Sequence, residues 1–276
     1  MARHAKTDNL IETAHEVLEQ GHPMTMRQVY YQLVSRQVIK NNLGRYKAVS
    51  NALVAARQEG LIPWEWIEDR LRRPRCVSMW PNLTEFAIDV GRAYRRDVWE
   101  TQPGYMEVWV EKDALSGIFA EVLEPYGVTL NVGRGYDGWD SIHNAAVRFG
   151  GGMGKTILYF GDFDPSGEDM VRSLRERLDF FGCVPEVEKC ALTADDVREY
   201  DLPPDFTKPR DTRRAAFVEK YGDVAVELDA LPVNVLRARL KAAVDTRMDL
   251  ASLAAARKVE DAERGHIISA LSGIVQ

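Results

Sequence analysis

The sequence is poor in the residues and segments that mark secreted, zinc-bound or membrane-inserted proteins. It has three cysteines in 276 residues, Cys76, Cys183 and Cys190, without a Cys-x-x-Cys pair, so neither a disulfide framework nor a zinc site is expected. No run approaches the ~18 consecutive apolar residues of a membrane span, and no apolar signal-peptide segment follows the charged N-terminus. We therefore expect a cytoplasmic protein without membrane association.

Positive charge is in deficit overall but unevenly distributed. The net charge is −6, which by itself argues against a nucleic-acid partner. Residues 1–80, however, carry 12 Lys and Arg against 8 Asp and Glu, whereas residues 81–276 carry 24 against 34. This asymmetry is typical of a polyanion-binding module joined to an acidic, metal-binding one. A chance distribution of solvent-exposed charges would also produce these counts.

Residues 1–80 have the pattern of a small helical DNA-binding domain. Apolar residues recur every three or four positions up to Gly21, a second helix begins after Thr25 and runs to about Val38, and a third spans about 45–59. The arginine-dense segment 70–75 follows in the position of a wing, so the unit resembles a winged helix-turn-helix domain. Residues 81–104 are expected to be a connector, with a helix over about 82–100.

Residues 105–276 alternate between short apolar runs and helical segments. The expected strands are 106–110, 128–132, 156–160 and 184–190, and the expected helices between them are 113–124, 140–149 and 167–181. Such alternation predicts an α/β domain whose mostly parallel sheet has helices on both faces. We expect Val224–Leu228 to add a strand before a helical C-terminus.

Acidic residues follow two of these strands at the point where each strand ends. Glu111 follows the first strand, and Asp162 and Asp164 follow the third, before a Pro-x-Gly turn. A spacing of two places both aspartates on the same side of an extended chain, and the carboxyl ends of parallel strands form the ligand-binding edge of an open sheet. The sequence therefore predicts that these carboxylates hold one or two Mg²⁺ ions, or Mn²⁺, at this edge.

Two adjacent tyrosines on the second helix are separated by helical geometry. Met26, Val29, Tyr30 and Leu33 form one apolar stripe at about 100° per residue. Tyr31 lies beside this stripe, one turn after Arg27 at i−4. We therefore expect Tyr30 to pack in the core and Tyr31 to be available for chemistry, with Arg27 as its cationic neighbour.

The carboxylate pattern resembles the Toprim domain of topoisomerases and primases. The segment MTMRQVYY (24–31) looks like the nucleophile helix of the topoisomerase VI A subunit and its relative, the meiotic double-strand-break transesterase, in which a winged-helix domain precedes Toprim. The segments GRGY (133–136) and VELDAL (226–231) are similar to two further family segments. The resemblance covers about residues 20–245 and is closest to the compact "mini-A" forms of phages and other mobile elements.

This resemblance implies a topoisomerase of type IIB that cleaves double-stranded DNA by transesterification. Tyr31 would become linked to a 5′-phosphate, and Arg27 and the metal would stabilise the charge that develops. Cleavage of two strands requires two tyrosines, hence a homodimer in which Tyr31 of one chain faces the metal site of the other. No ATPase domain is recognised in the sequence, so we expect either that strand passage needs a separate ATPase partner or that it does not occur. It also reads Asp137-Gly138-Trp139 where the family usually has Pro-Asp.

Basic and polar residues of the first domain are candidates for contacts with DNA phosphates. They lie away from the apolar face of the third helix or in the expected wing: Lys47, Asn51, Arg57, Arg70, Arg72, Arg73 and Arg75. Such residues provide salt-dependent affinity more than sequence recognition.

Two other functions remain open on the sequence alone. One is a hydrolytic Toprim nuclease in which water attacks the phosphate and Tyr31 takes no part. The other is a DNA-binding module without catalysis, which the complete set of Glu111, Asp162 and Asp164 argues against. The match to Gly-x-Gly-x-x-Gly at 133–138 is a weak nucleotide signal because it does not open the first strand-helix unit, and no organic cofactor is expected.

Overall fold

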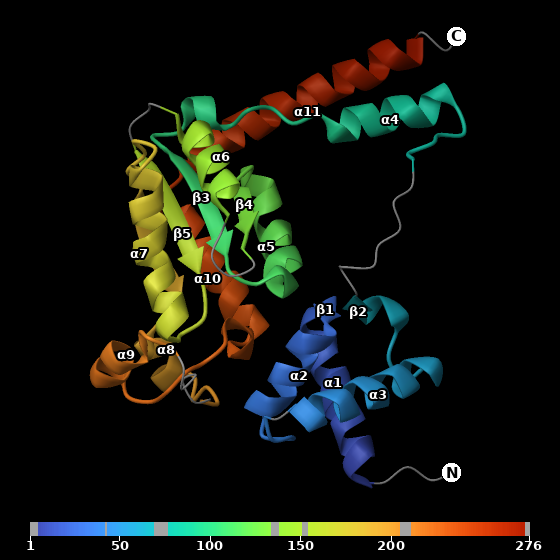
Figure 1. Ribbon diagram of the computed structural model, residues 1–276. Helices are drawn as coiled ribbons and strands as arrows, with labels where there is room; N and C mark the ends of the chain where they lie inside the picture. The colour runs from blue at the N-terminus through green and yellow to red at the C-terminus, as the bar shows by residue number, and fades with distance from the viewer. Residues whose placement is uncertain are drawn as a thin grey trace.

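The computed structural model describes residues 5–41, 43–68, 77–133, 138–150, 154–204 and 211–273. Within them the chain has an α/β architecture: a helical N-terminal unit lies below a four-stranded sheet that is flanked by helices (Figure 1). The expected α/β class is therefore confirmed, and the chain termini lie at opposite ends of the molecule (Figure 1).

Three helices and a short parallel β-pair make up the N-terminal unit. The elements are α1 (Ala5–Gly21), β1 (Met24–Thr25), α2 (Met26–Ser35), α3 (Leu43–Gln58), the 3₁₀ turn η1 (Trp64–Trp66) and β2 (Ile67–Glu68). Thr25 caps α2 as expected, because its hydroxyl accepts the Gln28 amide while the Gln28 side chain accepts the Thr25 amide. The three expected helices are confirmed. Residues 69–76, which contain the expected wing, lie outside the described residues.

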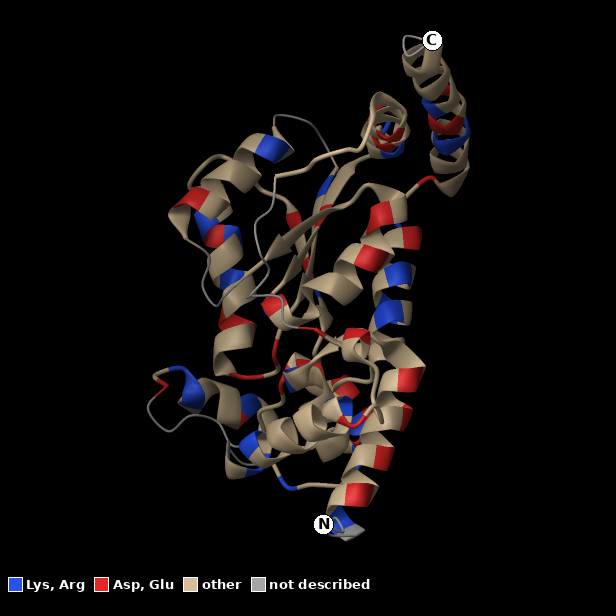
Figure 2. Ribbon diagram, turned by 90° about the vertical axis from the view of Figure 1, so that its right-hand side faces the viewer, with Lys and Arg blue, Asp and Glu red and all other residues tan. Residues whose placement is uncertain are grey.

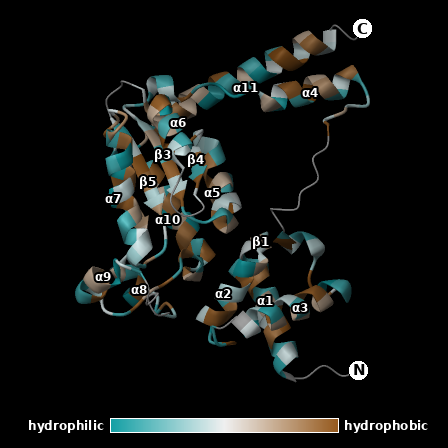
Figure 3. Ribbon diagram, viewed as in Figure 1, coloured by the Kyte–Doolittle hydropathy of each residue, from teal (hydrophilic) through white to brown (hydrophobic). Residues whose placement is uncertain are grey.

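The sheet has the strand order β4-β3-β5-β6, and all three neighbouring pairs are parallel. Its strands are β3 (Tyr105–Val110), β4 (Thr129–Val132), β5 (Lys155–Phe160) and β6 (Glu186–Ala191). All four agree with the expected strands to within about two residues. Hydrophobic residues occur along β3 and β5 (Figure 3), and residues 106–110 and 157–160 of these strands are buried, as expected of strands covered on both faces.

Helices cover both faces of this sheet and create two hydrophobic cores. One face packs against α5 (Ser116–Leu123) and α10 (Val233–Asp245), and its core continues into the N-terminal unit. The other face packs against α6 (Trp139–Phe149) and α7 (Pro165–Asp179). The remaining elements are the 3₁₀ turns η3 (Asp113–Leu115), η4 (Glu124–Tyr126) and η5 (Leu228–Ala230) and the helices α8 (Ala194–Glu199) and α9 (Arg214–Tyr221).

Two expected elements are shorter than the sequence pattern indicates. The connector contains α4 (Leu83–Ala93) and the 3₁₀ turn η2 (Trp99–Thr101) in place of a helix to residue 100. The expected strand at Val224–Leu228 is a single antiparallel bridge between Val226 and Phe163. None of the helices in the described ranges is both long and apolar enough to cross a bilayer.

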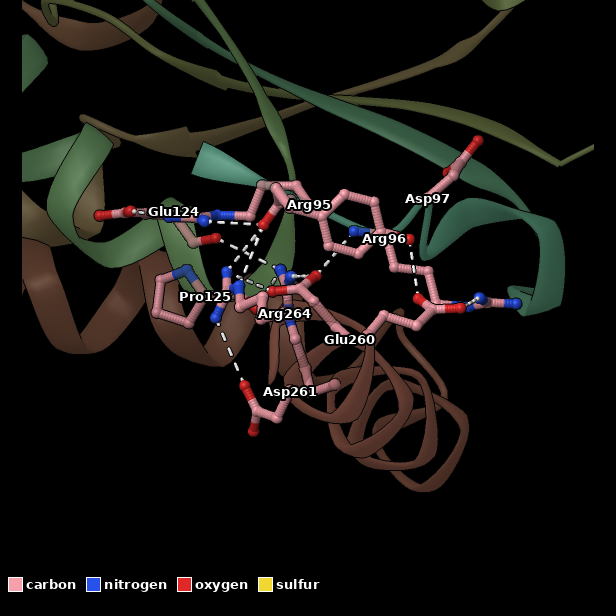
Figure 4. Close-up of polar contacts among 12 residues, drawn as sticks. Arg95, Arg96, Asp97, Glu124, Pro125, Glu260, Asp261 and Arg264 are labelled. Carbon is pink, nitrogen blue, oxygen red and sulfur yellow. Dashed lines mark hydrogen bonds and ion pairs between the residues drawn. The ribbon is translucent and has the colours of Figure 1, made fainter. Parts of the chain in front are cut away.

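The connector is held by the C-terminal helix α11 (Leu250–Gly273), which lies alongside α4 (Figure 1). The side chain of Glu260 is buried at this contact, where its Oε2 accepts the Arg96 amide at 2.8 Å. Arg264 donates to the Tyr94 carbonyl and pairs with Glu260 (Figure 4). These side chains satisfy backbone groups of 94–96 that a longer helix would have satisfied internally, and the helix therefore ends at Ala93.

Candidate functional site

The carboxyl ends of β3 and β5 bring Glu111 and Asp162 together. Val110 and Phe160 are register partners, and the Glu111 amide donates to the Phe160 carbonyl at 2.9 Å. The side chain of Glu111 then turns toward the neighbouring strand end, where its Oε2 accepts the Asp162 amide at 3.0 Å. The structure therefore places these two acids at one edge of the sheet, as the strand pattern predicted.

Asp164 begins the next helix. Its Oδ1 accepts the Gly167 amide at 2.6 Å and the Ser166 hydroxyl at 2.7 Å, which makes it the N-cap of α7. A Cβ on Gly167 would lie 2.2 Å from the Asp162 carbonyl oxygen, so glycine at this position permits the first turn of α7 to approach Asp162 closely. Asp164 thus has a structural role besides any role in binding a cation.

Helix α2 positions the two tyrosines differently, as helical geometry predicted. Tyr30 is 3% exposed and lies in the core. Tyr31 is half-buried, and the Arg27 guanidinium carbon lies 5.6 Å from the centre of its ring. The hydroxyl of Tyr31 is hydrogen-bonded to Glu227. Tyr31 and Arg27 therefore face the segment that precedes η5, and α2 packs against η5.

Three residues to which the sequence analysis assigned no role join this helix to the sheet edge. Lys112 lies with its Nζ 3.0 Å from Asp162 Oδ1, 2.9 Å from Glu227 Oε2 and 3.4 Å from Asp229 Oδ2. Glu227 Oε2 also accepts Arg27 Nη2 at 2.7 Å. The Lys112 Nζ is 5.9 Å from the centre of the Tyr31 ring. Lys112 and Glu227 therefore link Tyr31 to Asp162 within a single chain.

Burial and charge act in opposite directions on the acids of this site. Burial raises the pKa of Asp162 to about 7, although the positive charge of Lys112 opposes the rise. Burial also opposes ionisation of Glu227, but Lys112 and the hydrogen bonds from Tyr31, Lys112 and Arg27 outweigh it and lower the Glu227 pKa to about 2. Glu227 is thus a firmly ionised acceptor, whereas Asp162 carries a charge that the fold stabilises poorly without a further cation.

The basic groups and the phenol respond to the same surroundings. The nearby carboxylates outweigh burial and raise the pKa of both Lys112 and Arg27. Burial and Glu227 raise the pKa of Tyr31, and the opposing charges of Arg27 and Lys112 do not compensate. The Tyr31 hydroxyl therefore remains protonated while Glu227 accepts its hydrogen bond.

The donor set suits a hard divalent cation, although it does not form a ready-made cage. No group of three or more acidic, histidine or cysteine side chains in the described part of the chain has the arrangement of a metal site. In the contacts that the described residues make, Glu111 uses Oε2 whereas Asp162 and Asp164 use Oδ1. An ammonium group already lies against Asp162. Carboxylate oxygens are the ligands that Mg²⁺ prefers, and Asp162 is already paired with the Lys112 ammonium.

The expected DNA-contacting residues fall into three groups. Lys47 and Asn51 are exposed on α3, one turn apart. Arg57 turns inward instead, donates to the Trp64 and Ile67 carbonyls and stacks on the Trp64 ring at 4.2 Å. Its guanidinium therefore holds η1 and β2 against α3. Arg70, Arg72, Arg73 and Arg75 lie outside the described residues.

Charged residues of both signs meet where the N-terminal unit adjoins the sheet (Figure 2). Arg27 and Lys112 provide the positive charges there, and Asp162, Glu227 and Asp229 the negative ones. The candidate site is therefore a mixed-charge junction between two structural units.

The sequence comparisons do not assign this junction to a known family. No family model matches the chain, and no curated protein matches it significantly. The resemblance to the topoisomerase VI A family therefore stays a prediction.

Proposed function

We propose that this chain is a metal-dependent DNA transesterase of the topoisomerase VI A type, with a winged-helix unit followed by a Toprim domain. One observation carries the proposal: Tyr31 and Arg27 lie against the acidic sheet edge of the same chain, joined to Asp162 through Lys112 and Glu227. A nucleophile, two cations and a carboxylate edge within a few ångströms are the groups that phosphoryl transfer needs.

In the proposed reaction the Tyr31 oxygen attacks a backbone phosphorus atom. A new bond forms between this oxygen and phosphorus as the phenol gives up its proton to solvent, the bond from phosphorus to the 3′-oxygen breaks, and the departing oxygen takes up one proton from solvent. The products are a 5′-phosphotyrosine and a free 3′-hydroxyl. Because one phosphodiester replaces another, cleavage is reversible and needs no ATP.

The surrounding side chains have separate tasks in this reaction. Arg27 binds the anionic phosphate and offsets the charge that develops on it, whereas Lys112 pairs with Asp162 and Glu227 beside it. Glu111, Asp162 and Asp164 would hold Mg²⁺ or Mn²⁺, which supplies Lewis-acid stabilisation of the phosphate oxygens. Glu227 has to release the Tyr31 hydroxyl, because a phenol whose pKa is raised is a poor nucleophile.

The partners follow from the chemistry. Double-stranded DNA is the substrate, and Lys47 and Asn51 on α3 provide exposed polar contacts for its backbone. Breaks in both strands need two copies of Tyr31, so a homodimer is part of the proposal. Tyr31 contacts residues of its own chain. In the dimer, Tyr31 either keeps these contacts or leaves Glu227 and lies against the acidic sheet edge of the partner subunit. Strand passage would use a separate ATPase.

The test is an assay for covalent adducts. End-labelled DNA is incubated with the protein and Mg²⁺, denatured, and separated on a gel that retains protein-linked DNA. The expected result is adducts that disappear in Tyr31→Phe and Asp162→Ala and persist in Tyr30→Phe. The adjacent tyrosine is a matched control, because it is buried in the core. Absence of adducts from the wild-type protein with every DNA tested would contradict the proposal.

A hydrolytic Toprim nuclease is the second candidate, and the raised pKa of Tyr31 favours it. Water would then attack the phosphate in place of the phenol. The same gel separates the two reactions, because hydrolysis gives free DNA fragments and continues in Tyr31→Phe. A DNA-binding module without catalysis would shift the labelled DNA in a native gel and cleave none of it.

A further inference from the structure

The acidic residues around Lys112 allow its ammonium group to change partners. Its side chain is 14% exposed, and its single ammonium group is shared among Asp162, Glu227 and Asp229. Two of these contacts, at 3.0 and 2.9 Å, have full ion-pair length, whereas the contact with Asp229 Oδ2 is longer at 3.4 Å. The ammonium thus lies nearer to Asp162 and Glu227 than to Asp229.

Asp229 can accept a further hydrogen bond from this ammonium group. Its side chain is fully buried, and its Oδ1 has no hydrogen-bond partner among the described residues. A buried carboxylate oxygen without a donor costs free energy, so a donor that moves toward Asp229 gains a contact. Two cationic donors already lie beside it, because Lys112 Nζ and Arg27 Nε are each 3.4 Å from the other oxygen, Asp229 Oδ2.

We propose that Lys112 and a divalent cation compete for Asp162: the ammonium neutralises Asp162 in the metal-free protein, and metal binding shifts it to Asp229. This inference rests on the proposed function for its metal site. An ammonium group and a divalent cation bound to the same buried carboxylate repel each other. Asp162 Oδ1 also accepts the Leu228 amide at 2.8 Å, so the backbone holds the carboxylate in place while its cation changes.

The exchange has a consequence for the nucleophile. Glu227 Oε2 is the shared acceptor of Lys112 and Arg27, and Glu227 also binds the Tyr31 hydroxyl. A Lys112 ammonium that moves toward Asp229 alters this shared contact. Metal binding at the sheet edge is thereby coupled to the hydrogen bond that restrains Tyr31, and Lys112 is a positioning residue for the proposed reaction.

The test measures binding of Mn²⁺ alone to the full chain by calorimetry, without DNA. Lys112→Met removes the competing charge, and the expected result is about a tenfold rise in Mn²⁺ affinity, which is about 1.4 kcal/mol. Lys241→Met is the matched control, because it removes a lysine that pairs with an aspartate on α10. The Mn²⁺ affinity of this variant should stay within about twofold of wild type. Unchanged or weaker binding in folded Lys112→Met overturns the proposal, as does failure of both proteins to bind Mn²⁺.

A double-mutant cycle tests the destination of the ammonium. Asp229→Asn should weaken Mn²⁺ binding about fivefold in the wild-type background, because Lys112 loses its alternative partner, and should have little effect in the Lys112→Met background. Equal weakening in both backgrounds contradicts the shift to Asp229. If Lys112→Met does not fold, as judged by thermal unfolding in EDTA, Lys112→Gln is measured in its place, and the same results are expected.

These binding measurements separate this inference from the proposed function. Tighter Mn²⁺ binding by Lys112→Met together with absence of covalent adducts supports the competition and rejects the transesterase. Adducts from the wild-type protein together with unaltered Mn²⁺ binding by Lys112→Met reject the competition alone.

Discussion

Replacement of Glu227 by glutamine tests whether this carboxylate joins the N-terminal unit to the sheet. Glu227 accepts Arg27 Nη2 at 2.7 Å and Lys112 Nζ at 2.9 Å, and it binds the Tyr31 hydroxyl. Glu227→Gln has nearly the same shape but carries no charge. Arg27 and Lys112 then lose their shared anionic acceptor, while the Tyr31 hydroxyl can still donate to the amide oxygen.

The size of the effect follows from the Glu227 pKa. The difference between the ordinary value of 4.5 and the folded value of about 2 corresponds to about 3 kcal/mol of folding stability. The side chain is 35% exposed, and solvent screening reduces the expected contribution to about 1.5 kcal/mol. Because the folded pKa is depressed, this stability is present above pH ~4.5 and is lost as the pH falls toward 2.

Urea unfolding in EDTA measures the effect between pH 3 and pH 8. At pH 7, Glu227→Gln should unfold more easily than wild type by about 1.5 kcal/mol, and the difference should become smaller below pH 4.5. Glu12→Gln, an exposed change on α1, is the control and should alter stability by less than about 0.5 kcal/mol. Equal stability of Glu227→Gln and wild type at pH 7, or a difference that grows on acidification, refutes the assigned role of this carboxylate.

Three further changes test other parts of the site. Asp164→Ala should cost about 1 kcal/mol in thermal unfolding because it removes the N-cap of α7, whereas Asp164→Asn should keep the cap and still abolish the proposed adducts. Gly161→Ala places a Cβ 2.8 Å from Glu111 Oε2 and should weaken Mn²⁺ binding in calorimetry at a stability cost of about 1–3 kcal/mol. Arg148→Met leaves the fully buried Glu107 carboxylate without its ion-pair partner and should cost about 3 kcal/mol in urea unfolding, against less than about 0.5 kcal/mol for the exposed Arg172→Met.

The alternation of hydrophobic runs predicted the sheet well because its strands are buried on both faces. Trp109, Val110 and Phe160 are all 2% exposed or less, and short continuous apolar runs between helical segments are typical of the strands of a parallel sheet. The connector was harder to predict because its end depends on a distant helix. Tyr94 and Arg96 obtain backbone partners from Arg264 and Glu260, which local periodicity cannot indicate.

The candidate site was predicted only as far as topology determines it. Parallel strands necessarily bring Glu111 and Asp162 to one edge, and a helical stripe necessarily separates Tyr30 from Tyr31. The contacts of Lys112 with Glu227 and Asp229 depend on how η5 packs against α2, across more than 110 residues of sequence. One signal for them was present, since Glu227 and Asp229 repeat the spacing of Asp162 and Asp164.

The charge balance of the junction gives an argument for a cation that does not depend on family resemblance. Arg27 and Lys112 face three carboxylates, those of Asp162, Glu227 and Asp229. The Glu111 carboxylate lies beside Asp162, and a phosphate would add another negative charge. Like charges in a partly buried site repel strongly, so the metal-free junction disfavours the DNA backbone that the proposed reaction requires. Affinity for a short duplex should therefore rise on addition of Mg²⁺ in the wild-type protein, and rise less in Asp162→Asn, in which one of these negative charges is already absent.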